Sequence, residues 1–136
     1  SRNTYHSDTI LYMIENGFHK KLHFLITSYI LVGYKTTKQF PDDERFGMIS
    51  QARRALVSIL LNYVEGYARS KKAVMINFYE ISYGSLQETI CVFYLATQLK
   101  YIAKEQYQKL FNQKEEIAKM IWKTVEGLKA DSANKK

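Results

Sequence analysis

The chain contains little proline, little glycine and a single cysteine. One proline and six glycines are spread over 136 residues. An all-β sandwich needs many turns, and turns depend on these two residue types, so the composition argues against that class. Cys91 is the only cysteine, so it cannot form a disulfide within the chain or hold a zinc ion by itself. This cysteine usage is typical of a reducing compartment, and we expect a cytoplasmic protein.

Long hydrophobic runs are also missing. The longest apolar stretch, residues 22–34, is interrupted by polar or small residues and bracketed by lysines. A membrane-spanning helix needs about 20 apolar residues. The N-terminal residues also lack the basic and apolar segments of a signal peptide. We therefore expect no membrane partner.

Motifs for metal binding and catalysis are absent as well. No glutamate is followed three residues later by histidine, which is the pairing that holds di-metal centres in helical bundles. His19 and His23 have helical spacing, but Lys20 and Lys21 lie between them and repel a cation. The glycine-rich phosphate loops and the nucleophile elbow are not found either. The sequence thus predicts no metal, no cofactor and no enzymatic activity.

Helical periodicity dominates the rest of the chain. Apolar residues recur at helical spacing after Gly17 to about residue 38, and again over 43–68, 73–99 and 104–129. A short helix over 8–16, ending at Asn16-Gly17, is a further candidate. Short links between long helices are typical of an antiparallel up-and-down four-helix bundle. We assign the bundle to residues 18–130, with an N-terminal extension (1–17) and a polar tail (131–136).

The third predicted helix is apolar on two sides. One side has the spacing of a coiled-coil seam, which we expect to face the bundle: Phe78, Ile81, Ser85, Glu88, Val92, Leu95 and Leu99. A second apolar stripe lies nearly opposite: Met75, Tyr79, Tyr83, Leu86, Ile90 and Tyr94. A helix that is apolar almost all round is buried on both sides. We expect the second stripe to be an interface with another copy; the alternative is that residues 5–14 fold over it.

Four polar residues are expected to form a layer between the second and third helices: Asn62, Glu65, Ser85 and Glu88. A buried carboxylate is costly unless it is paired or hydrogen-bonded. Such a layer either contains an acid/base pair or fixes the register of the helices. Because no histidine or metal-ligand set accompanies it, we favour the register interpretation.

Basic residues give the chain a net charge of +7. A positive surface attracts phosphates without reading sequence. The predicted nucleic-acid contacts are Arg53, Arg54, Arg69, Lys71, Lys72, Lys114, Lys119 and Lys123. The alternatives are a merely solvated lysine-rich face and, for Arg53 and Arg54, pairing with Glu44 or Glu80 of a neighbouring subunit.

Several motifs follow one another in a familiar order. They are F-P-x-x-E-R-F-G at 40–47, Q-x-R-R-A at 51–55, N-x-x-E-G at 62–66 and G-S-L-x-E at 84–88. In this order the chain resembles the four-helix-bundle family encoded in intervening sequences of bacterial 23S ribosomal RNA genes. The same superfamily includes the accessory variability determinants of diversity-generating retroelements. Leu60 departs from the pattern, because the family usually has proline there.

The resemblance implies a homopentamer of four-helix bundles. For the retroelement branch it also implies a reverse transcriptase as partner, together with the RNA or DNA that the enzyme copies. We therefore expect a non-enzymatic, basic, oligomeric protein that binds nucleic acid and belongs to one of these two branches. The alternative is a self-assembling structural or protein-interaction module that binds no nucleic acid.

Overall fold

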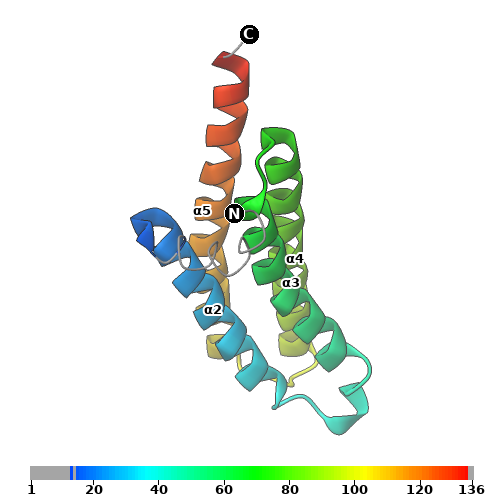
Figure 1. Ribbon diagram of the computed structural model, residues 1–136. Helices are drawn as coiled ribbons and strands as arrows, with labels where there is room; N and C mark the ends of the chain where they lie inside the picture. The colour runs from blue at the N-terminus through cyan, green and yellow to red at the C-terminus, as the bar shows by residue number, and fades with distance from the viewer. Residues whose placement is uncertain (1–12, 14, 135–136) are drawn as a thin grey trace.

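The computed structural model describes Met13 and residues 15–134, and this part of the chain forms four long α-helices without a strand. The helices are α2 (Gly17–Thr37), α3 (Met48–Ala68), α4 (Lys72–Gln98) and α5 (Lys104–Asn134), and a 3-10 turn, η2 (Asp42–Glu44), precedes α3. Consecutive helices run antiparallel, and α5 returns to pack against α2 (Figure 1). Contact is most extensive between α3 and α4. The predicted all-α four-helix fold is thus confirmed.

Asn16 starts the first helix of the bundle. Its side-chain oxygen accepts hydrogen bonds from the backbone N–H groups of Phe18 (3.1 Å) and His19 (3.2 Å). Asparagine is a preferred N-cap because it satisfies N–H groups that have no partner within the helix. The sequence interpretation placed Asn16-Gly17 at the end of a short helix over residues 8–16. Most of that segment lies outside the described residues, so the short helix stays a prediction.

The second long helix begins later than predicted, at Met48 rather than near residue 43. The acidic residues after Pro41 form the separate turn η2, and the Glu44 carboxylate accepts a hydrogen bond from the Met48 N–H at 3.3 Å. A Cβ atom on Gly47 would lie 2.8 Å from the Glu44 Oε1 atom, so a side chain at position 47 would displace the Glu44 carboxylate from its present place. The acidic residues were correctly associated with a helix start. Glu44, however, lies before α3 and caps it through the Met48 N–H instead of belonging to its first turn.

The link from α4 to α5 reverses the chain at Lys100. This residue has φ 66°, in the left-handed region. The N–H of Tyr101 donates to the carbonyl of Ala96 at 2.8 Å, and the N–H of Lys100 donates to that of Thr97 at 3.0 Å, which is the pattern of a Schellman ending. After this link, α5 continues to Asn134. The expected polar tail is therefore helical for four residues beyond the predicted bundle boundary at residue 130.

The core shows that α4 is rotated relative to the sequence interpretation. Tyr79, Leu86 and Phe93 are almost completely buried, whereas Ile81 is 43% exposed and Leu95 is 52% exposed. Most of the predicted inward seam thus lies toward the outside, although Val92 is buried, and the predicted interface stripe contributes to the core. This orientation buries large aromatic rings, which gain most from leaving water, and leaves the Glu88 carboxylate exposed.

The assignment of an intersubunit interface to the second stripe of α4 was therefore wrong for its buried residues. Tyr79, Leu86 and Ile90 lie in the chain's own core, and Met75 and Tyr83 are partly buried against it. Tyr94 alone among the six predicted residues is half exposed, at 50%.

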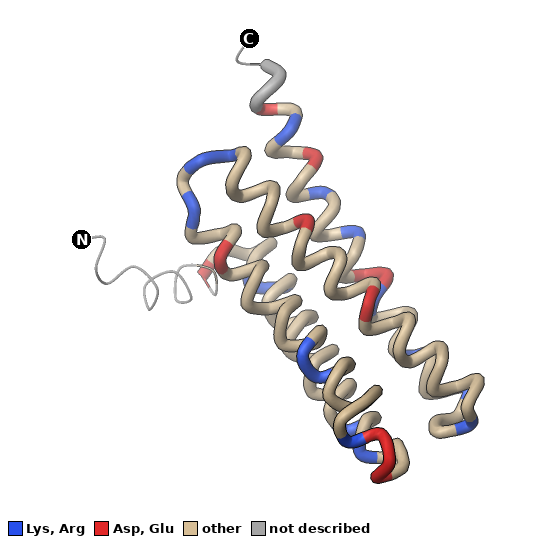
Figure 2. The backbone as a smooth tube through the Cα atoms, turned by 90° about the vertical axis from the view of Figure 1, so that its right-hand side faces the viewer, with Lys and Arg blue, Asp and Glu red and all other residues tan. Residues whose placement is uncertain are grey.

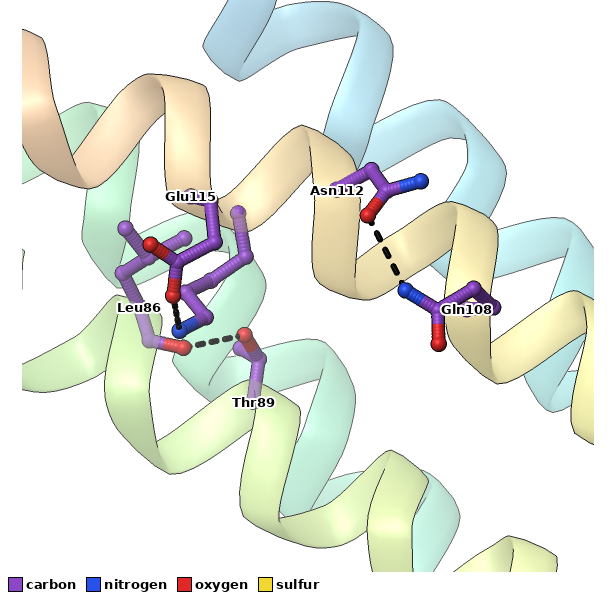
Figure 3. Close-up of polar contacts among 6 residues, drawn as sticks. Leu86, Thr89, Gln108, Asn112 and Glu115 are labelled. Carbon is purple, nitrogen blue, oxygen red and sulfur yellow. Dashed lines mark hydrogen bonds and ion pairs between the residues drawn. The ribbon is translucent and has the colours of Figure 1, made fainter.

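A short chain of hydroxyl groups crosses the core between α2 and α4. Thr89 donates its hydroxyl proton to the carbonyl oxygen of Leu86 at 2.6 Å (Figure 3). The Tyr29 hydroxyl lies 2.7 Å from Thr89 Oγ1, and it acts as the donor because the threonine proton is already used. Burial raises the pKa of Tyr29 well above its usual range. These buried polar groups are thus satisfied and neutral.

Candidate nucleic-acid interface

The predicted polar layer lies at the edge between α3 and α4, not in the core. The Ser58 and Ser85 hydroxyls are 2.7 Å apart, and the Asn62 side-chain amide donates to Ser58 Oγ at 2.9 Å. These three residues are partly buried. The contacts join the two helices at one height, which agrees with a role in fixing their register.

The two carboxylates of this layer are not brought together. Glu88 is exposed and accepts a hydrogen bond from Gln51, whereas Glu65 pairs with Arg69 at 2.7 Å. Gln51 and Glu65 are separated by about 21 Å along α3, at roughly 1.5 Å per residue. The expectation of one layer holding both carboxylates was wrong, and the acid/base interpretation loses its geometry.

Basic residues gather at the end of the bundle that carries the α3–α4 link (Figure 2). Arg69 and Lys71 are exposed in this link. The Lys72 ammonium lies 3.6 Å from the Asp131 carboxylate, so the last turns of α5 run beside the start of α4. We call Arg69, Lys71, Lys72, Lys123 and Lys129 the basic end.

Two exposed lysines of α5, Lys119 and Lys123, line an open groove with aromatic walls. The groove has a volume of about 660 Å³. Its aromatic residues are Phe18 from α2, Tyr83 from α4 and Trp122 from α5. Lys123 also borders a second groove with His19, so the α5 lysines lie close to the start of α2. Lys123 also shares this second groove with Tyr67 of α3 and Met75 of α4, the helices that flank the α3–α4 link, whereas Lys119 lies one turn earlier on α5.

Lys114 does not belong to this surface, and its predicted contact with phosphate is contradicted. Only 5% of the residue is exposed. Its ammonium lies 2.7 Å from Glu115 and 4.4 Å from the centre of the Phe111 ring, where α5 packs near Leu86 and Thr89 (Figure 3). The hydrogen bond from Lys114 lowers the pKa of Glu115. Position 114 falls between Leu110 and Ile117 on the core-facing stripe, a signal that was present in the sequence.

The adjacent arginines of α3 have different environments. Arg53 donates to Thr37 Oγ1 at 3.0 Å and lies over the Tyr34 ring at 4.8 Å, so it joins α3 to the end of α2. Arg54 is exposed and donates to Gln51 at 3.1 Å. Both lie about 24 Å along α3 from Arg69, at roughly 1.5 Å per residue. The two arginines therefore lie apart from the basic end.

The histidine pair is not arranged as a metal site. The Nδ1 atom of His19 lies 2.6 Å from the Tyr63 hydroxyl, and its ring packs edge-on against Tyr67 at 4.6 Å. Burial lowers the pKa of both His19 and His23. They therefore add little positive charge at neutral pH. Over the described part of the chain, no group of three or more His, Cys, Asp or Glu side chains is arranged to hold a metal ion.

Sequence reasoning missed the aromatic groove, and Trp122 in particular. Trp122 is 43% exposed, contacts Tyr83 at a ring distance of 5.6 Å and lies under the Lys129 ammonium at 5.7 Å. The available signal was a tryptophan next to the core residue Ile121, between Lys119 and Lys123. The groove forms only because Phe18, which is distant in sequence, lies across from Trp122, so it could be recognised only from the tertiary structure.

None of the helices in the described residues is both long and apolar enough to cross a membrane.

Comparisons with known proteins agree with this architecture. A crystal structure of a protein with unknown function, from the S23 ribosomal protein family of Bacteroides thetaiotaomicron, superposes with a TM-score of 0.67. The two sequences are 25% identical, and the alignment covers 76% of this chain and 97% of the other. No curated protein matches the sequence. Residues 27–123 match the 23S rRNA-intervening sequence protein family, and this match spans well over half of the sequence. The chain belongs to that family.

Proposed function

We propose that the protein is a non-enzymatic, self-assembling four-helix bundle that binds nucleic acid through the basic end. The observation that carries this proposal is the clustering of cations from the α3–α4 link and from α5, all of them exposed except the partly buried Lys72. Three acidic groups lie near these five cations: Glu65 pairs with Arg69, Asp131 pairs with Lys72, and Glu126 lines the same groove as Lys123, so the cluster keeps a positive balance. Arg and Lys on such a surface bind phosphates regardless of base sequence.

Self-assembly is supported by the outward side of α4. Val74, Ile81 and Leu95 are exposed and lie on one heptad position, which the exposed Glu88 interrupts between Ile81 and Leu95, and Leu99 is also 52% exposed. Apolar heptads of this kind form the seams of helix–helix interfaces. We propose that this stripe contacts another copy, and the family resemblance favours five copies. The stripe is equally compatible with the alternative of a self-assembling module that binds no nucleic acid.

Salt dependence of binding tests the basic end. The variant R69Q/K71Q/K72Q removes three charges from the α3–α4 link, and K35Q/K38Q/K104Q removes three exposed charges from the opposite end (Figure 1). The first variant is expected to lower the log–log salt slope by about one unit per lost contact. The matched variant should leave the slope almost unchanged. Equal effects of the two variants would show that binding reflects net charge alone.

Absence of binding leads to a different conclusion. If the unmutated protein binds neither RNA nor DNA near 50 mM salt, where phosphate contacts are strong, the interaction-module alternative replaces this proposal. Light scattering on the same samples measures the oligomer. A monomer at micromolar concentration would contradict self-assembly through α4.

The two branches of the family resemblance differ in the biological role that they imply. The family match favours an rRNA-insert protein, and an accessory role for a retroelement reverse transcriptase stays a prediction. A pull-down with and without nuclease treatment distinguishes them. Nuclease-resistant capture of a reverse transcriptase would support the accessory role, whereas nuclease-sensitive capture of RNA alone would support the rRNA-insert setting.

A further inference from the structure

We infer that the groove around Trp122 binds an unpaired stretch of RNA by stacking a base on the indole ring. This inference rests on the proposed nucleic-acid binding and adds which form of nucleic acid is bound, and how. The relevant surface is the 660 Å³ groove lined by Phe18, Tyr83 and Trp122 together with Lys21, Lys119 and Lys123. It combines aromatic and cationic side chains in one site.

Trp122 has the geometry of a stacking platform. Tyr83 contacts its ring at 5.6 Å and Lys129 lies 5.7 Å from its centre, yet 43% of the residue remains exposed. These neighbours hold the indole in place and leave part of its surface free. Bases of single strands stack on such rings, whereas the bases of a duplex are already stacked on one another. The aromatic groove therefore favours unpaired nucleic acid.

The charges in the groove are suited to a sugar–phosphate backbone. Lys119 and Lys123 are exposed on successive turns of α5, on either side of Trp122. Lys21 is engaged with Glu116 at 3.6 Å, so the two α5 lysines are the principal cations for phosphates. A base on Trp122 thus places its flanking phosphates near positive charge.

Two carboxylates in the groove indicate RNA rather than DNA. Glu115 and Glu126 line the same surface, and the pKa of Glu115 is lowered by its hydrogen bond from Lys114. An ionised carboxylate repels phosphate but accepts a hydrogen bond from a hydroxyl group. The ribose 2′-hydroxyl supplies such a donor, and deoxyribose does not. The groove thus has partners for the base, the phosphate and the 2′-hydroxyl of RNA.

Trp122 is the only tryptophan of the chain, so intrinsic fluorescence reports directly on this site. The probe is a twelve-nucleotide oligouridine, added to the full chain. Stacking is expected to quench the fluorescence, with a titration midpoint equal to that from the anisotropy of labelled oligouridine. A twelve-base-pair RNA duplex should give little quenching, and deoxyoligouridine should bind about 2- to 10-fold more weakly, as expected for one lost hydrogen bond.

Substitution of the ring provides the second measurement. W122A should weaken oligouridine binding about 5- to 150-fold, the range expected for one stacked base, and W122F should lie between W122A and the unmutated protein. The matched control is F46A, because Phe46 is 91% exposed and does not line the groove. Circular dichroism of each variant establishes that the fold is retained, and W122F keeps the test valid if W122A unfolds.

The outcomes separate this inference from the proposal on which it rests. Binding by anisotropy without quenching, and with W122F and W122A unaffected, would overturn stacking while leaving phosphate binding intact. Absence of any binding would overturn the proposed function itself. Equal binding of the deoxy probe would overturn the preference for ribose. Fluorescence that changes with protein concentration but not with oligouridine would show that another copy occupies the groove.

Discussion

The orientation of α4 can be tested by replacing one leucine with alanine on each of its two sides. Leu86 is completely buried in the bundle core, and Leu95, nine residues later, is 52% exposed. Replacing a fully buried leucine with alanine costs about 2–5 kcal/mol, because apolar surface is lost from the core and a cavity remains. The same change at an exposed site usually alters the free energy of unfolding by less than about 0.5 kcal/mol.

L86A is therefore expected to lower the free energy of unfolding by about 3 kcal/mol. In a domain of this size that corresponds to roughly 10 °C in Tm. L95A should leave the unfolding of the isolated chain nearly unchanged. If Leu95 lies between copies, its substitution lowers the mass measured by light scattering, and its effect on stability grows with protein concentration.

Urea denaturation followed by circular dichroism, at several protein concentrations, provides the measurement. The slope of unfolding free energy against urea should be the same for both variants, since neither changes the fold. A large, concentration-independent loss for L95A together with a small loss for L86A would refute the observed orientation of α4. That result would restore the seam expected from the sequence.

Three further predictions concern individual side chains. R53Q should lower the free energy of unfolding by about 1–2 kcal/mol, because Arg53 loses its hydrogen bond to Thr37 and its contact with Tyr34. The matched R54Q should change it by less than about 0.5 kcal/mol in the same urea assay. Equal losses would contradict the different environments of the two arginines. K100G should stabilise the chain by about 0.5–1 kcal/mol, since glycine adopts the left-handed conformation without a Cβ clash. An unchanged or lower Tm would show that the backbone at Lys100, between α4 and α5, carries no strain. Burial lowers the pKa of His19 below 6.5, so the unfolded state binds a proton before the folded state does as pH falls, and the free energy of unfolding should decrease below about pH 6.5. H19Q should reduce this pH dependence. An identical pH profile for H19Q and the unmutated protein would contradict the role of His19.

The number and position of the helices could be predicted from the sequence because they depend on local signals. The apolar spacing of residues 73–99 closely matches α4, and the Phe40-Pro41 break separates α2 from α3. The end of α5 was less accurate, since the polar residues after Lys129 carry no apolar period although they remain helical. Likewise, the acidic residues at 42–44 indicated a helix start, but they form the separate turn η2, and the Glu44 carboxylate accepts a hydrogen bond from the N–H of Met48, the first residue of α3.

The candidate site was only partly accessible from sequence. Arg69, Lys71 and Lys72 are adjacent in the chain, so their clustering was visible without a structure. Their proximity to Lys123 depends on how α5 runs beside the α3–α4 link, as the contact between Lys72 and Asp131 shows.

What the sequence by itself determined is therefore a basic, all-helical bundle with apolar stripes on each helix, because periodicity and charge are properties of neighbouring residues. The tertiary structure decided which stripe of α4 faces inward. Both stripes have helical spacing, and the choice depends on how well Tyr79 and Phe93 fill the space left by the other helices. It also brought Lys123 beside His19 of α2 and Tyr67 of α3, because the surroundings of a charged side chain come from helices distant in sequence.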